Sequence, residues 1–219
     1  MLRKINNYRE PLNLLNEVEK ENEKIPNEAF FNDPGHQKDT EKWCASVFGL
    51  GYSQYCKKCV VKVNDSKRDM SPDFFLKVNS QVFEFEITEV QKEGRKRGKY
   101  FKDLKNNPYL TEEYRPEYCR QESPRLIYEA IKSKALKCYE NSGNLNILVY
   151  VNLDTENLYR NETARKSEEF SSTFASIWII TNLQICSIFS NDVLGKIDDF
   201  KEITERKNRN LDRYVLRTA

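Results

Sequence analysis

Three acidic residues and a threonine recur in one short segment at a spacing that could do chemistry. Asp73 stands just before an aromatic and apolar run, and Glu84, Glu86 and Thr88 follow at every second position. Side chains alternate along a β-strand, so these last three are expected on the same face of a strand. A hairpin between the two apolar runs would return Asp73 beside that face, and the carboxylates would converge.

A convergent set of carboxylates is suited to a hard cation. Like charges at short range repel by several kcal/mol unless positive charge lies between them. Mg²⁺ or Mn²⁺ accepts one or two carboxylates together with water and phosphate oxygens, and lowers the pKa of a bound water. The alternative is that Glu84, Glu86 and Thr88 form the solvated face of an amphipathic edge strand.

The elements that must position these residues follow the order α, α, β, β, β, α, β, α, β. Helices are expected at residues 11–24, from Thr40 to the glycines at 49 and 51, at 124–141 and at 163–174. Strands are expected at 60–63, 73–78, 81–90 and 145–153, with one or two more in 177–189, and a turn at Asn79-Ser80. This order predicts an α/β fold with a mixed central sheet flanked by helices.

The pattern of acids resembles a known signature. Asp73 after a proline, a hairpin and then Glu86 resemble the motif of PD-(D/E)XK nucleases, and the order α-β-β-β-α-β over residues 40–153 resembles their restriction-endonuclease-like core. The resemblance implies a Mg²⁺- or Mn²⁺-dependent nuclease that hydrolyses phosphodiester bonds, in DNA more than in RNA. It implies metal ligation by Asp73, by Glu86 and by the backbone carbonyl of Ile87, with Glu41 of the preceding helix as a further ligand. Glu41 could equally be a first-turn residue that favours the helix dipole.

Thr88 departs from the motif, because the family usually has a lysine there. Either Glu84 takes part in its place as a third acid, or Lys92 or Lys96 approaches the site. If neither holds, the chain is a catalytically degenerate relative that acts as a nucleic-acid or protein binding module.

A basic segment directly follows the acidic strand. Phosphate contacts supply most of the non-specific affinity for nucleic acid, so these cations are expected to guide a nucleic-acid strand; the alternative is a solvated surface. The candidate contacts are Lys92, Arg95, Lys96, Arg97, Lys99 and Lys102.

The composition limits which classes of function the chain can have. Among 219 residues, 36 Lys and Arg balance 34 Asp and Glu, so binding to nucleic acid would rest on local clusters. The start has no apolar signal region and no stretch is apolar enough to span a bilayer, so a cytoplasmic protein without membrane contact is expected. The expected division is an N-terminal helical extension, 1–39, and a nuclease-like domain, 40–219, for which the family resemblance allows a homodimer.

Six cysteines in such a chain are expected to be reduced thiols. Cys56 and Cys59 have the spacing of half a zinc site or of a redox pair. The sequence offers no second pair of that kind, so structural thiols are the preferred interpretation.

Overall fold

A computed structural model describes residues 7–22, 36–64, 71–91, 116–137, 139, 142–153 and 158–206. Its centre is a seven-stranded sheet in the order β1-β2-β3-β4-β5-β6-β7. The strands are β1 (Cys59–Val63), β2 (Phe74–Val78), β3 (Gln81–Gln91), β4 (Leu145–Asn152), β5 (Ser176–Ile180), β6 (Gln184–Phe189) and β7 (Lys201–Glu202). The helices are α1 (Pro11–Asn22), α3 (Gln37–Tyr55), α5 (Pro116–Ala135) and α6 (Arg160–Ser167), with short 3₁₀ turns at Ser142–Asn144 and Glu168–Ser172.

The sheet is mixed. β1, β2 and β3 form an antiparallel meander, β3, β4 and β5 run parallel to one another, and β5, β6 and β7 are again antiparallel. The α/β class and the mixed, helix-flanked sheet predicted from the sequence are therefore confirmed, and the predicted order α-β-β-β-α-β is present from α3 to β4.

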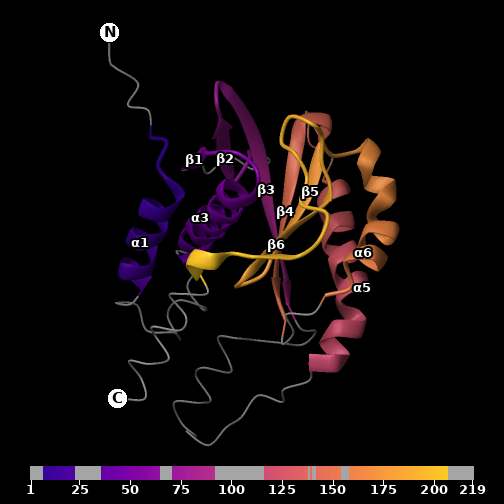
Figure 1. Ribbon diagram of the computed structural model, residues 1–219. Coiled ribbons are helices and arrows are strands. Elements are labelled where there is room, and N and C mark those ends of the chain that lie inside the picture. Colours follow the sequence, from indigo (N-terminus) through magenta and orange to yellow (C-terminus); the bar gives the residue numbers. More distant parts are fainter. Residues whose placement is uncertain are drawn as a thin grey trace, which may run out of the picture.

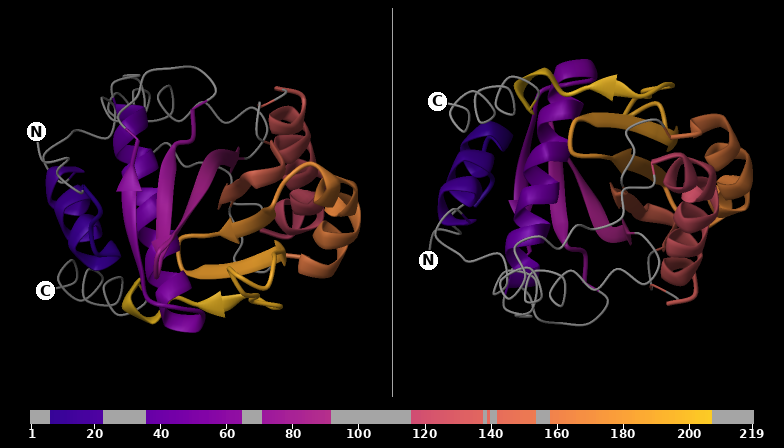
Figure 2. Two further views of the ribbon diagram at one scale, coloured as in Figure 1. Left: turned by 90° about the horizontal axis from the view of Figure 1, so that it is seen from above. Right: turned by 90° about the horizontal axis from the view of Figure 1, so that it is seen from below.

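Helices cover the sheet on both sides. α1 and α3 lie on one side and α5 and α6 on the other (Figures 1 and 2). Each side has its own apolar core, centred on residues such as Phe48 and Trp178 on the α3 side and Ile127 and Ile131 on the α5 side. β4 contributes to both cores, because Leu148 packs on the α3 side and Ile147 on the α5 side. The prediction that this strand is covered on both faces is confirmed.

The second helix extends further than predicted. Two glycines were expected to end it, but α3 continues through both to Tyr55. A Cβ atom on Gly49 would lie 2.8 Å from Pro11 Cγ, and one on Gly51 would lie 3.0 Å from Ile185 Cγ2. These glycines therefore permit close packing of α3 against its neighbours, which is a role that the local sequence does not reveal.

The other helix bounds also differ from those predicted. α5 begins at Pro116 rather than at Pro124, which lies buried inside the helix, and ends at Ala135. The helix predicted at 163–174 is α6 followed by the 3₁₀ turn at Glu168–Ser172.

The first helix packs into the same core as α3. Leu14, Leu15 and Val18 are buried there, while Leu12, predicted on that stripe, is 36% exposed. The predicted division at residue 39 is not tested by these contacts and stays a prediction. No helix in the described part of the chain is long and apolar enough to cross a membrane.

Candidate functional site

The hairpin of β2 and β3 brings Asp73 beside Glu86. Phe74 pairs with Phe85, and the ladder continues by one residue because Asp73 N–H donates to the Phe85 carbonyl at 2.8 Å. The rings of Phe74 and Phe85 stack with centroids 4.8 Å apart and hold this register. The turn contains Asn79 at φ 55°, a left-handed conformation that asparagine tolerates.

Asp73 is partly buried and held by the backbone. Its Oδ2 accepts a hydrogen bond of 2.7 Å from the Ile87 N–H. Burial, followed by the charge of Glu86, raises the pKa of Asp73 to about 6, although the hydrogen bond from Ile87 opposes this shift. An elevated carboxyl pKa indicates that additional positive charge at this position would be favourable.

Glu86 is also buried, at 7% exposure. Its Oε1 accepts hydrogen bonds from Lys134 Nζ at 2.7 Å and from the Tyr139 hydroxyl at 3.0 Å. Its Oε2 is buried and has no hydrogen-bond partner among the described residues. Burial and the charge of Glu86 together raise the pKa of Tyr139, so this hydroxyl stays protonated and acts as a donor.

Lys134 was not foreseen as part of the site. It lies in the last turn of α5, three residues beyond the buried Ile131, and its side chain is only 13% exposed. The sequence does contain a signal for this role, because Lys134 continues the apolar stripe of Ile127 and Ile131. A lysine on a buried stripe usually has an acidic partner. Lys134 puts beside Glu86 the positive charge that Thr88 does not supply.

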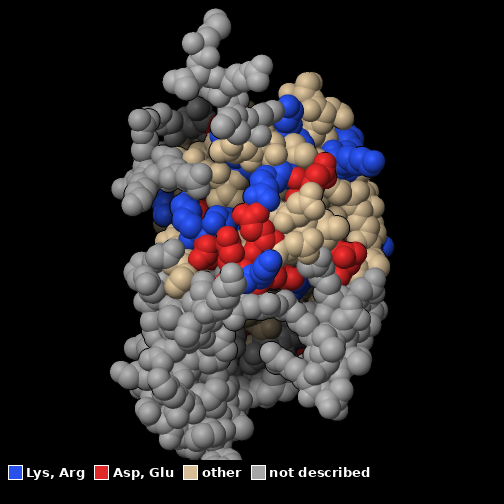
Figure 3. Space-filling model, turned by 90° about the vertical axis from the view of Figure 1, so that its left-hand side faces the viewer, with Lys and Arg blue, Asp and Glu red and all other residues tan. Residues whose placement is uncertain are grey.

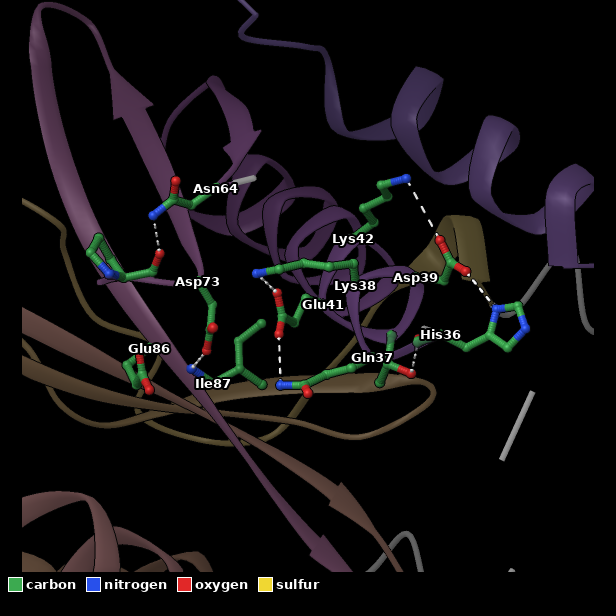
Figure 4. A network of polar contacts seen from close by, with 12 residues as sticks. His36, Gln37, Lys38, Asp39, Glu41, Lys42, Asn64, Asp73, Glu86 and Ile87 are labelled. Carbon is green, nitrogen blue, oxygen red and sulfur yellow. Dashed lines mark hydrogen bonds and ion pairs between the residues drawn. The ribbon is translucent and has the colours of Figure 1, made fainter. Parts of the chain in front are cut away.

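Glu41 of α3 faces the same region from the opposite side (Figure 4). It is 5% exposed, and its two carboxylate oxygens accept hydrogen bonds from Gln37 and Lys38. Its charge also raises the pKa of Asp73, as a smaller cause than burial or Glu86. In this arrangement Glu41 contributes negative charge, and its role as a metal ligand stays a prediction.

The two other residues of β3 that were predicted for the site, Glu84 and Thr88, make no hydrogen bond to its acids. Both are half-buried. Glu84 instead lines a groove beside β4. The roles predicted for these two residues and for the Ile87 carbonyl stay predictions.

The predicted nucleic-acid contacts, Lys92 to Lys102, lie outside the described residues. On the face that carries α1, acidic side chains gather at the centre with lysines and arginines around them (Figure 3). α1 carries exposed Glu17 and Glu21, and Arg9 forms an ion pair with Glu17. The described residues of this face are therefore of mixed charge and form no continuous basic surface among themselves.

Cys56 and Cys59 are free thiols in this structure. Burial raises the pKa of both thiols, that of Cys59 to about 11, which disfavours the thiolate that zinc or redox chemistry requires. Cys59 Sγ lies 3.2 Å from Ser53 Oγ and also contacts the Gly49 carbonyl. These contacts favour structural thiols.

No protein-family model matches the chain, and no curated protein matches it significantly. A solved structure from Pseudomonas aeruginosa strain PAO1, described as a protein of unknown function in the monooxygenase superfamily, is similar with a TM-score of 0.44 and 14% identity. The similarity covers 83% of this chain and 84% of that one.

The prediction of a PD-(D/E)XK nuclease is therefore wrong, because the structural match carries another superfamily name and no family model supports a nuclease. Phosphodiester hydrolysis and the degenerate nuclease-fold module are withdrawn with it. The physical reason is that the hairpin register places position 73 beside position 86 whatever the family, so an Asp and a Glu at these two positions do not define one. The similarity is also too weak to transfer the neighbour's name to this chain.

Proposed function

We propose that the protein binds one divalent cation, Mg²⁺ or Mn²⁺, between the carboxylates of Asp73 and Glu86. The observation that carries this proposal is the buried Oε2 atom of Glu86, which has no hydrogen-bond partner in the described part of the chain. A buried carboxylate oxygen without a partner is costly, by roughly 1–3 kcal/mol or more for a charged group. A cation at this atom would remove that cost.

The charges around the site support a cation in addition to Lys134. Asp73 and Glu86 bring two negative charges against the one ammonium of Lys134, and Glu41 is paired with Lys38. Burial, and after it the negative charge of Glu86, raises the pKa of Asp73. A divalent ion would compensate this charge without removing Lys134 from the carboxylate.

The number of acids suits Mg²⁺ or Mn²⁺ better than a metal that needs an all-protein cage. No group of three or more His, Cys, Asp or Glu side chains within the described ranges could hold a metal ion. Mg²⁺ commonly keeps several waters and binds one or two carboxylates. A two-carboxylate site with water in the other positions is consistent with both facts.

Lys134 and Tyr139 have a positioning role in this proposal. Both donate to Oε1 of Glu86, so they fix the carboxylate and leave Oε2 for the cation. Such support of a ligating carboxylate by hydrogen bonds is typical of metal sites. The ammonium of Lys134 would also lie close to any anionic group that binds to the cation.

Calorimetric titration of the full chain with Mg²⁺ and with Mn²⁺ near neutral pH tests the proposal. We expect one ion per chain, with affinity reduced at least about tenfold in Asp73→Asn and in Glu86→Gln. Glu89→Gln is the matched control, because Glu89 lies on the same strand and is held by Asn152 of β4. Equal binding by all four proteins, or no binding by the parent, would contradict the proposal.

A further inference from the structure

Lys134 has unused hydrogen-bond donors beside the proposed cation site. An ammonium group carries three N–H donors, and one from Lys134 is donated to Glu86 Oε1 at 2.7 Å. Within the described residues no second hydrogen bond or ion pair of Lys134 is recorded. Its side chain is 13% exposed, so the other donors are largely withdrawn from water. These donors are therefore available to a ligand.

The net charge of the cluster changes sign when a divalent cation binds. Three carboxylates and two ammonium groups lie in this region, those of Asp73, Glu86, Glu41, Lys134 and Lys38 (Figure 4). Without a cation the carboxylates are in excess by one charge. A divalent cation adds two positive charges, so the occupied cluster has one positive charge in excess. Such a charge in a partly buried position is stabilised by an ion of opposite sign, and the occupied cluster therefore favours an anion.

The cation would also have coordination positions free for an oxyanion. Mg²⁺ and Mn²⁺ bound by one or two carboxylates keep several waters, and oxygen atoms of a ligand can replace them. The cation is proposed at Oε2 of Glu86, and Lys134 donates to Oε1 of the same carboxylate. A group that binds the cation through one oxygen can therefore accept a hydrogen bond from Lys134 through another.

The face of the sheet beside the cluster is partly open to solvent. Glu84 lies on the same face of β3 as Glu86, one step closer to the hairpin turn, and pairs with Phe75 of β2. Glu84 and Phe75 are both half-buried, whereas Phe74 and Phe85, on the opposite face, are fully buried. A small ligand can therefore approach the cluster along this face of the hairpin.

We infer that the cation and Lys134 together bind an oxyanion group, a phosphate or a carboxylate, of a small-molecule ligand. One oxygen of the group coordinates the cation and a second accepts a hydrogen bond from Lys134. This inference rests on the proposed function, because the anion binds only where the cation is present.

The first test is thermodynamic linkage in the parent protein, which requires no variant. Two ligands that favour each other's binding raise each other's affinity by the same factor. Calorimetric titration with Mg²⁺ should give an affinity at least about fivefold higher in about 5 mM inorganic phosphate or pyruvate than in chloride of equal ionic strength, after correction for Mg²⁺ that the anion itself binds. The two anions separate the two sources of the oxyanion, and an increase with either one supports the inference.

The second test assigns the anion to Lys134. Protein-bound Mn²⁺ relaxes the ³¹P nucleus of phosphate, or the ¹³C nucleus of the pyruvate carboxylate, only where the anion binds beside it. At matched Mn²⁺ occupancy, anion affinity should fall about tenfold or more in Lys134→Gln and be retained in Lys134→Arg, which keeps the charge. Lys132→Gln, at an exposed position of the same helix, is the control. Circular dichroism with Mn²⁺ present checks that each variant is folded.

The outcomes separate this inference from the proposed function. Cation binding with the same affinity in phosphate, pyruvate and chloride would overturn the inference and leave the cation site standing. Equal anion affinity in the parent and in Lys134→Gln would overturn it as well. Absence of cation binding under every condition would overturn both proposals.

Discussion

Glu86 and Lys134 form a buried ion pair from distant parts of the chain. The two side chains are 9% and 13% exposed, and the nitrogen lies 2.7 Å from the oxygen. Removal of one partner from such a pair leaves an uncompensated charge in a poorly solvated position, which is far more costly than the net contribution of the intact pair. The stability of the cluster should therefore depend strongly on Lys134.

Lys134→Met should lower the free energy of unfolding by about 3 kcal/mol in the absence of metal, because Glu86 would remain buried without its counter-charge. Added Mn²⁺ should restore more stability to this variant than to the parent. Urea unfolding with Mn²⁺ and with EDTA measures both effects. Lys132→Met, an exposed position on the same helix, is the control, and an equal loss of stability in the two variants would refute the prediction.

Asp73 should make stability depend on pH. Its pKa in the folded protein is about 6 against an ordinary value of 3.8. An acid whose pKa is raised by folding contributes stability below its unfolded pKa and loses this contribution as the pH rises through the folded pKa. In metal-free protein, the loss between about pH 4 and pH 6 should be roughly 2–3 kcal/mol.

Asp73→Asn should remove this loss, because the amide oxygen can still accept the hydrogen bond from Ile87 but carries no charge. The variant should be more stable than the parent near neutral pH and similar to it near pH 4. Unfolding free energies measured across that range in EDTA test the prediction. Parallel pH profiles for the two proteins would show that Asp73 titrates normally.

At the scale of elements, the close packing of α3 depends on glycine. A Cβ atom on Gly49 would meet Pro11 Cγ at 2.8 Å and Val61 Cγ1 at 3.0 Å, and both belong to packed apolar side chains. Gly49→Ala should therefore force α1 or β1 away and lower the free energy of unfolding by roughly 1–3 kcal/mol. Gly143→Ala, where the space is open, should change it by less than about 0.5 kcal/mol. Equal effects at the two positions in thermal unfolding would contradict this account of α3.

The β2–β3 hairpin was readable from sequence because all its determinants are local. Alternating aromatic residues, the turn at Asn79 and the position of Asp73 are contained in one segment, and the structure keeps that arrangement. Lys134 was not readable in the same way, because it is 48 residues from Glu86 and reaches it only through the docking of α5 on the sheet. The extent of α3 was missed for a related reason, since the partners of its glycines come from α1, β1 and β6.

At the scale of the whole molecule, one sheet carries two cores, and the first helix belongs to one of them. Leu15 is fully buried against α3. Leu15→Ala should lower the free energy of unfolding by about 2–5 kcal/mol and leave a single transition. A separate early transition, with the main one unchanged, would show instead that residues 1–39 form an independent extension.

The assignment to the PD-(D/E)XK nucleases, which concerns the whole molecule, is the part of the sequence interpretation that is wrong. The placement of Asp73 beside Glu86 is a local consequence of hairpin register. The prediction of the α/β class is confirmed, because it depends on the order and periodicity of many elements. A family assignment from one short motif lacks that redundancy, particularly where Thr88 already departs from the pattern.

The measurement that tests the central claim most directly is anomalous diffraction from crystals of the full chain grown or soaked with Mn²⁺. The proposal predicts one strong peak about 2.0–2.3 Å from carboxylate oxygens of both Asp73 and Glu86, with Lys134 still donating to Oε1 and water in the remaining positions. A peak elsewhere, or no peak at these two residues under saturating Mn²⁺, would contradict the claim that they hold a divalent cation.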